Sequence, residues 1–144
     1  SKTINIFFVG DIVGQPGLEL AINLVPNYVK KYAVDLLIIN GENTTEGKGI
    51  AEEHAKKIFE LGAHVITTGN HVWDRWDSRK VLGGDRRILR PLNYPPGTPG
   101  QGSVILEVPG PRSGVQGTVT VAVVNAQGRT FMPVLENPFM AVPP

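Results

Sequence analysis

Three polar clusters in the first half of the chain combine side chains that could bind metal ions. Each begins with a glycine and follows an apolar run, and they are Gly10-Asp11, Gly41-Glu42-Asn43 and Gly69-Asn70-His71. Carboxylate, amide oxygen and imidazole together suit Mn, Fe or Zn better than Ca, which prefers oxygen alone. A carboxylate such as that of Asp11 or Glu42 can also bridge two cations about 3.5–4 Å apart. The clusters therefore indicate a two-metal site of the kind that hydrolyses phosphate esters.

Each of these residues, taken alone, has an ordinary structural explanation. Asp11 could cap a helix or stabilise a turn, while Glu42 and Asn43 could be solvated loop residues. Asn70 could occupy a turn with a left-handed backbone, and His71 could be a histidine with a satisfied hydrogen bond. The shared location favours chemistry, because independent turn residues after successive strands would not need to combine Asp, Glu, Asn and His.

Two glycine patterns in the same region can be compared with known nucleotide-binding loops. Gly10, Gly14 and Gly17 form G-x-x-x-G-x-x-G, which differs from the G-x-G-x-x-G pattern of a dinucleotide-binding fold. The segment Gly47-Lys48-Gly49 lacks the rest of the Walker pattern, including its Ser or Thr. Neither pattern predicts a nucleotide-binding loop.

The other histidines and the nearby aromatic residues give weaker predictions. His54 falls in a predicted helix and His64 at the start of a predicted strand, so we expect neither to bind the metals. Trp73, Trp76 or Tyr94 could stack on a nucleobase at the mouth of the site, although aromatic residues in such places more often pack. Tyr94 is the weak candidate for substrate binding.

The apolar pattern predicts the elements that must position the three clusters. Strands are expected at residues 4–9, 35–39 and 63–67, and helices at residues 17–32 and 50–61. We expect the first two strands to be buried and Pro26 to kink the first helix or end it early. This β-α-β-α-β order is typical of an α/β domain with right-handed crossovers. Because ligands bind beyond the carboxyl ends of such strands, all three clusters should meet at one edge.

The second half of the chain has a weaker pattern. Residues 74–82 suit a short helix, and residues 83–102 read as a long loop rich in Pro and Gly. Residues 103–108 and 117–124 predict two strands that pair as a hairpin. The tail, residues 125–144, has no clear period.

The bulk composition fits one domain that spans residues 1–144. The 144 residues are 41% hydrophobic, which is enough for an ordinary core. The net charge of +1 gives no strong field for polyanions, so stable nucleic-acid binding is not expected. The chain has no Cys and no apolar stretch near the ~20 residues that span a bilayer, so we expect a cytoplasmic protein without membrane contact.

Several longer motifs together resemble one protein family. They are Phe8-Val9-Gly10-Asp11-Ile12-Val13-Gly14, Asn40-Gly41-Glu42-Asn43, Thr67-Thr68-Gly69-Asn70-His71-Val72-Trp73-Asp74, Leu89-Arg90-Pro91, Asn93-Tyr94-Pro95-Pro96-Gly97-Thr98-Pro99-Gly100 and Asn125-Ala126-Gln127-Gly128-Arg129. In this order they resemble the YmdB-like branch of the calcineurin-like metallophosphoesterases over residues 4–139. The resemblance implies a layered α-β-β-α sandwich, of which this chain would form mainly the first β-α-β-α-β half and a hairpin.

The resemblance also implies an activity and a role for each residue of the clusters. Asp11 and Asn43 would bind the first metal. Glu42 would bridge both metals, Asn70 would bind the second, and His71 would be the proton donor. The cofactors would be two divalent or trivalent ions, Fe or Mn, with Zn or Mg as alternatives. The substrate would be a small phosphodiester such as a 2′,3′-cyclic nucleotide.

The sequence departs from this family in one respect. The family completes its site with a histidine and a His-x-His pair from a C-terminal half, whereas no histidine follows His71 here. We therefore expect a domain truncated on its C-terminal side, or a natural variant that cannot hold both metals alone. A non-catalytic nucleotide-binding or interaction module and a structural fragment with vacant metal sites remain alternatives. The Pro-rich loop and the apolar tail suggest a homo-oligomer, which the family would support.

Overall fold

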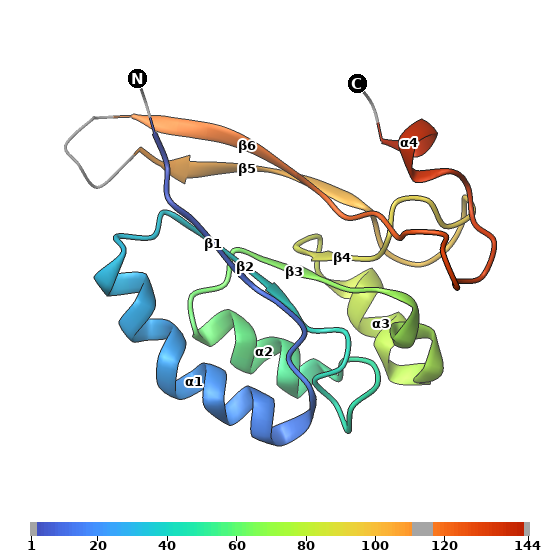
Figure 1. Cartoon of the computed structure of the whole chain (residues 1–144), viewed down its shortest axis with the longest axis horizontal. Coiled ribbons are helices and arrows are strands. Elements are labelled where there is room, and N and C mark those ends of the chain that lie inside the picture. Colours follow the sequence, from blue (N-terminus) through green and yellow to red (C-terminus); the bar gives the residue numbers. More distant parts are fainter. Residues whose placement is uncertain (1–2, 111–116, 143–144) are drawn as a thin grey trace.

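The computed structural model describes residues 3–110 and 117–142, and its central element is a parallel β-sheet (Figure 1). The four strands lie in the order β1-β2-β3-β4, and every neighbouring pair is parallel. They are β1 (Ile6–Val9), β2 (Leu36–Asn40), β3 (Val65–Thr67) and β4 (Ile88–Leu89). One helix connects β1 to β2 and another connects β2 to β3, so the predicted β-α-β-α-β order is confirmed.

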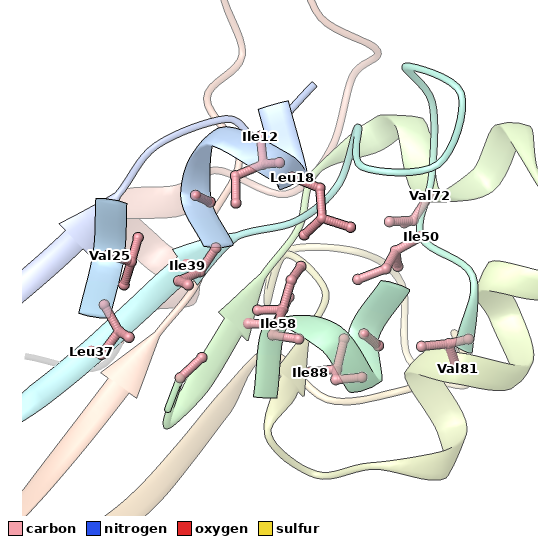
Figure 2. Close-up of a cluster of buried hydrophobic side chains, with 14 of the residues drawn as sticks. Ile12, Leu18, Val25, Leu37, Ile39, Ile50, Ile58, Val72, Val81 and Ile88 are labelled. Atoms are coloured by element: carbon pink, nitrogen blue, oxygen red, sulfur yellow. The ribbon is translucent and has the colours of Figure 1, made fainter. Parts of the chain in front are cut away.

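Helices cover one face of this sheet (Figure 1). They are α1 (Gly14–Lys31), α2 (Glu52–Glu60) and α3 (Trp76–Gly84), and a short 3₁₀ helix, η1 (Asn70–Asp74), precedes α3. The inner sides of the helices pack on the sheet in one buried cluster, in which Leu18, Ile39 and Ile58 are fully buried (Figure 2). Within the described part of the chain, no helix is both long enough and apolar enough to cross a membrane.

A β-hairpin covers the opposite face of the sheet (Figure 1). Its strands, β5 (Ser103–Pro109) and β6 (Thr118–Val124), pair antiparallel as predicted. Alternate side chains of the hairpin point toward the sheet and form a second buried cluster with it. This cluster contains Leu36, Val65, Leu89, Val104, Val108 and Val123. Helices, parallel sheet and hairpin together form three layers of the expected sandwich.

One expectation about the first β-α unit is wrong, and one of the two alternatives for Pro26 is excluded. β1 is an edge strand, and Ile6 and Phe8 are 55% and 56% exposed rather than buried. Phe7 and Val9 pack on the helix side of the sheet, whereas the described cluster under the hairpin contains residues of β2, β3 and β4 but none of β1. An apolar run does not reveal whether a distant hairpin covers its second face, so the sequence could not reveal this. Pro26 does not end α1. It lies on the exposed side of the helix, where the carbonyl that it leaves unpaired can meet water.

Two short elements in the second half of the chain were not predicted. β4 has only two residues, falls within the expected loop and is recognised by its pairing with β3. The tail contains α4 (Pro138–Ala141), a single turn capped by the side chain of Asn137. Elements this short have no measurable periodicity, so only their tertiary contacts define them. The expected connection between the hairpin strands falls partly at residues 111–116, which lie outside the described residues.

Leu36→Ala should lower the free energy of unfolding by about 2–5 kcal/mol, because it removes a fully buried side chain from the cluster between sheet and hairpin. Leu20→Ala is the matched control, since Leu20 is 60% exposed and should change stability by less than about 0.5 kcal/mol. Urea unfolding followed by circular dichroism measures both. Equal losses in the two variants would contradict the layered packing.

Candidate functional site

Backbone hydrogen bonds continue beyond the strands and bring the three polar clusters to one edge of the sheet. Ile12 N donates to Asn40 O at 3.2 Å, and Gly41 N donates to Thr67 O at 3.0 Å. The first two loops are therefore bonded to the end of the neighbouring strand directly beside their polar residues. The three clusters follow the carboxyl ends of β1, β2 and β3, as predicted.

The side chain of Asn43 links the first cluster to the third. Its Nδ2 donates to Asp11 Oδ1 at 2.7 Å, and its Oδ1 lies 2.6 Å from Nδ1 of His71. Because a carboxylate accepts hydrogen bonds, the amide nitrogen must face Asp11 and the amide oxygen must face His71. Nδ1 of His71 therefore carries a hydrogen, and Nε2 is the ring nitrogen that can exchange a proton. Asn43 is buried, whereas 38% of the His71 side chain is exposed.

Glu42 contacts the backbone of the third cluster. Its Oε2 accepts a hydrogen bond from His71 N at 3.4 Å and lies 4.0 Å from His71 Nδ1. Gly69 faces the same carboxylate so closely that a Cβ atom built there would lie 2.7 Å from Oε1. Any residue larger than glycine at this position would therefore displace the carboxylate of Glu42.

The loop that carries Glu42 and Asn43 is fixed at two further points. Gly14 N donates to Asn43 O at 2.9 Å, which ties the loop to the start of α1. At the far end of the loop, the buried hydroxyl of Ser78 in α3 accepts from Ile50 N at 2.9 Å and donates to Ile50 O at 3.0 Å. Bonds to backbone groups therefore fix both ends of this loop, and the ion pair between Arg75 and Glu46, at 2.9 Å, adds a contact between them.

The donor atoms at this edge fit part of a metal site rich in oxygen. Asp11 and Glu42 provide carboxylates, and Asn43 and Asn70 provide amide oxygens. Asn70 is half buried and begins η1. The gap left by Gly69 accommodates the Glu42 carboxylate that such a site would use. Residues 3–110 and 117–142 contain no group of three or more His, Cys, Asp or Glu side chains placed to hold one ion, so amide oxygens would have to contribute.

Tyr94 lies beside the third cluster. Its ring packs against Trp73 of η1, with ring centroids 5.2 Å apart. Its hydroxyl donates to Gln127 Oε1 at 3.1 Å. Burial raises the pKa of Tyr94, and the negative charge of Glu42 adds to the increase. The phenol therefore stays protonated at neutral pH and remains a hydrogen-bond donor next to the clusters.

Two amide side chains near the site, those of Asn93 and Asn125, were not singled out by the sequence patterns. Nδ2 of the buried Asn93 donates to Gln127 O at 2.9 Å, and its Oδ1 accepts from Gln127 N at 3.0 Å. Asn125 Nδ2 donates to Thr68 O at 2.6 Å. These bonds join segments that are 34 and 57 residues apart, so no local spacing could have indicated them. In the sequence, these residues stood out only because they belong to two of the longer motifs that carry the family resemblance.

The two histidines that were not expected to bind metal lie elsewhere. His64 Nδ1 accepts a hydrogen bond from Leu37 N at 3.0 Å, before the start of β3. His54 Nδ1 lies 2.7 Å from Thr45 Oγ1. Both positions agree with the expectation that these histidines do not join the clusters.

Trp76 differs from the other two aromatic candidates. It is 82% exposed, and its ring centroid lies 5.2 Å from the guanidinium carbon of Arg79. Trp73 and Tyr94 instead pack on each other. The pair of Trp73 and Tyr94 is therefore the better placed aromatic surface beside the clusters.

Comparison with known sequences agrees with the motifs. A sequence model described as YmdB-like protein matches residues 7–144. The chain is 39% identical over 137 residues to the 2′,3′-cyclic-nucleotide 2′-phosphodiesterase of Bacillus subtilis (strain 168), and the match covers 95% of this chain and 49% of that protein. The chain spans half or less of the length of the curated relatives that it matches.

Two crystal structures share the fold. One is that of a hypothetical protein from Thermus thermophilus, with a TM-score of 0.82 and 38% identity, covering 94% of this chain and 50% of that chain. The other is that of a novel phosphatase from Mycoplasma pneumoniae, with a TM-score of 0.79 and 30% identity, covering 95% of this chain and 48% of that chain. The layered α/β arrangement is therefore one that a phosphatase also has.

Tyr94 should ionise only at a pH above that of a free tyrosine, because burial raises its pKa. Since the pKa is higher in the folded state, the stability contributed by the protonated phenol is complete below the unfolded-state pKa of about 10. This contribution is lost as the pH rises through the folded-state pKa. The free energy of unfolding should therefore fall above about pH 10 more steeply in the wild type than in Tyr94→Phe.

Urea unfolding at a series of pH values from about 8 to 11 measures this difference. Tyr32→Phe is the control, because Tyr32 is 55% exposed. In this variant the free energy of unfolding should fall with pH as it does in the wild type. If Tyr94→Phe and the wild type lost stability with the same slope, the burial of Tyr94 would be contradicted.

Proposed function

The chain belongs to the YmdB-like protein family, and from this membership we propose that it forms the first half of the active site of a metal-dependent phosphodiesterase. The observation that carries the proposal is the row of contacts from Asp11 through Asn43 to His71, with Glu42 on the backbone of the same cluster. The relative in Bacillus subtilis is named for the cleavage of 2′,3′-cyclic nucleotides, so a small phosphodiester of this class is the proposed substrate.

Four residues would hold two metal ions in the complete site. Asp11 and Asn43 would bind the first ion. Glu42 would bridge both ions, and Asn70 would bind the second. Fe or Mn suits this set, because amide oxygens and a nearby imidazole accompany the carboxylates.

The proton that the leaving group needs would come from His71. When bound, the two ions would supply positive charge for the phosphoryl oxygens and a water whose pKa is lowered toward about 7. Asn43 accepts from Nδ1–H of His71 and holds the ring in one orientation, so Nε2 of the protonated imidazolium would give its proton to the departing ribose oxygen and leave the neutral imidazole. Cleavage of the 2′ bond would leave a 3′-phosphate.

Tyr94 and Trp73 would form an aromatic surface for the nucleoside part of the substrate. Their rings pack together, Trp73 lies in the same 3₁₀ helix as His71, and the Tyr94 hydroxyl is held by Gln127. Stacking on such a surface is tolerant of the base, because every base has a π-face.

The proposed enzyme acts in the cytoplasm and associates with copies of itself. The absence of Cys fits a reducing compartment. Large apolar side chains of the tail, Phe131, Val134, Phe139 and Met140, are 76% exposed or more, as expected for residues that contact another subunit.

A second candidate function is nucleotide binding without catalysis. It is favoured by one observation, that the described residues hold no group of three or more His, Cys, Asp or Glu side chains placed around one ion. Such a module would bind nucleotide after metal removal by a chelator and would not hydrolyse it. The phosphodiesterase would lose turnover on the same treatment and regain it when Mn was restored.

Hydrolysis of 2′,3′-cyclic AMP by the full-length natural protein with Mn or Fe tests the proposal. Asn70→Ala and His71→Ala should each lower kcat by about 100-fold or more, because the first removes a proposed ligand of the second metal and the second removes the proposed proton donor. His64→Asn is the control and should keep the wild-type rate, because His64 lies before the start of β3. Equal rates for the wild type and both site variants would sink the proposal.

Gly69→Ala should weaken Mn binding by about tenfold, because the added methyl group displaces the Glu42 carboxylate. The fold should remain, since the methyl group meets the movable end of a side chain. Gly83→Ala is the matched control, because a Cβ at Gly83 meets no atom within 4 Å. Isothermal titration with Mn measures both variants, and an unchanged affinity in Gly69→Ala would contradict the role of Glu42.

A further inference from the structure

The hydrogen-bond ladder between β3 and β4 ends at Pro91, opposite the residue that precedes the third cluster. Ile66 N donates to Arg87 O at 2.8 Å, and Thr68 N donates to Leu89 O at 3.0 Å. In a parallel ladder, each residue that donates in this way also accepts at its carbonyl from the residue two positions further along the neighbouring strand. Thr68 O should therefore accept from the backbone N–H of residue 91. That residue is Pro91, which has no N–H.

The side chain of Asn125 supplies the missing donor. Its Nδ2 donates to Thr68 O at 2.6 Å and also to Leu89 O at 3.1 Å. The backbone of Asn125 is fixed at the end of β6, because its N donates to Gly102 O at 2.9 Å and its O accepts from Leu92 N at 2.8 Å. The amide group is thus held in place by its own backbone before it reaches the sheet edge.

Thr68 directly precedes Gly69, Asn70 and His71, so its carbonyl sets where the third cluster begins. On one side, Asn125 holds Thr68 O, and the Thr68 hydroxyl donates to Leu89 O at 2.8 Å. On the other side, Gly69 meets the carboxylate of Glu42. A shift of Thr68 would therefore move Gly69 toward Glu42 or away from it.

We propose that Asn125 is a positioning residue for the proposed phosphodiesterase site, and that it acts by replacing the backbone N–H that Pro91 cannot offer. It does not touch the substrate or the metals. It holds the segment of Thr68 and Gly69 so that Asn70 and His71 meet the first two clusters. This inference rests on the proposed function. It identifies Asn125, directly after β6, as a residue that holds the third cluster in place.

The test compares Asn125→Ala, Pro91→Ala and the double variant in the full-length natural protein. Asn125→Ala should lower kcat for 2′,3′-cyclic AMP by about 10- to 100-fold, the size expected when a reacting group is misplaced by about 1 Å. KM should change little, because the proposed aromatic surface is left intact. Pro91→Ala alone should keep wild-type kcat, and in the double variant its restored N–H should recover most of the loss.

Asn5→Ala is the matched control, because Asn5 Nδ2 also donates to two carbonyls, Tyr32 O at 3.1 Å and Ala33 O at 3.2 Å, just before the start of β1. It should leave kcat unchanged, because Asn5 lies at the opposite end of the sheet from the clusters. Wild-type kcat in Asn125→Ala would overturn the inference. An equal kcat loss in Asn5→Ala, or a loss that Pro91→Ala does not reduce, would also overturn it.

Titration of the same variants with Mn separates this inference from the proposed function. Asn125→Ala should bind Mn about tenfold more weakly than the wild type, as changes to residues that orient metal ligands commonly do. A wild type that neither hydrolyses the substrate nor binds Mn would refute the proposed function. A wild type that does both, together with an Asn125→Ala variant that matches it, would refute the role of Asn125 alone.

Discussion

A single buried amide group joins the side chains of the three loops at the sheet edge. Asn43 donates to Asp11 at 2.7 Å and lies 2.6 Å from the Nδ1 of His71, so one side chain of the second loop joins the first loop to the third. An amide has one donor end and one acceptor end, and the carboxylate of Asp11 decides which end faces which partner. The tautomer of His71 follows from this, and so does the ring nitrogen that we assign to proton transfer.

The bridge through Asn43 depends on two close contacts between the backbone before His71 and side chains of other segments. Gly69 leaves the space that the Glu42 carboxylate fills, and Asn125 provides the hydrogen bond that Pro91 withholds from Thr68. Both features lie where the parallel ladder ends. There, backbone groups that the ladder no longer uses become available to side chains, which is one physical reason why sites form beyond the carboxyl ends of such strands.

Much of the fold was predictable, because buried parallel strands and amphipathic helices leave clear patterns over five or more residues. The convergence of the three clusters was predictable for the same reason, since strand ends fix where the clusters lie. The exposed face of β1, shown by Ile6 and Phe8, was not predictable, because it depends on how far the hairpin, which is distant in sequence, extends across the sheet. The roles of Asn93 and Asn125 depend on bonds between distant segments, so only the structure reveals them.

The central claim is that the strand-end clusters bind metal ions. Anomalous diffraction from crystals of the full-length natural protein grown with Mn tests it most directly, because the signal locates the ions without reference to activity. Two neighbouring peaks are expected, one against Asp11 and Asn43 and one against Asn70, with Glu42 in contact with both. Peaks elsewhere in the molecule, with none at this edge of the sheet, would contradict it.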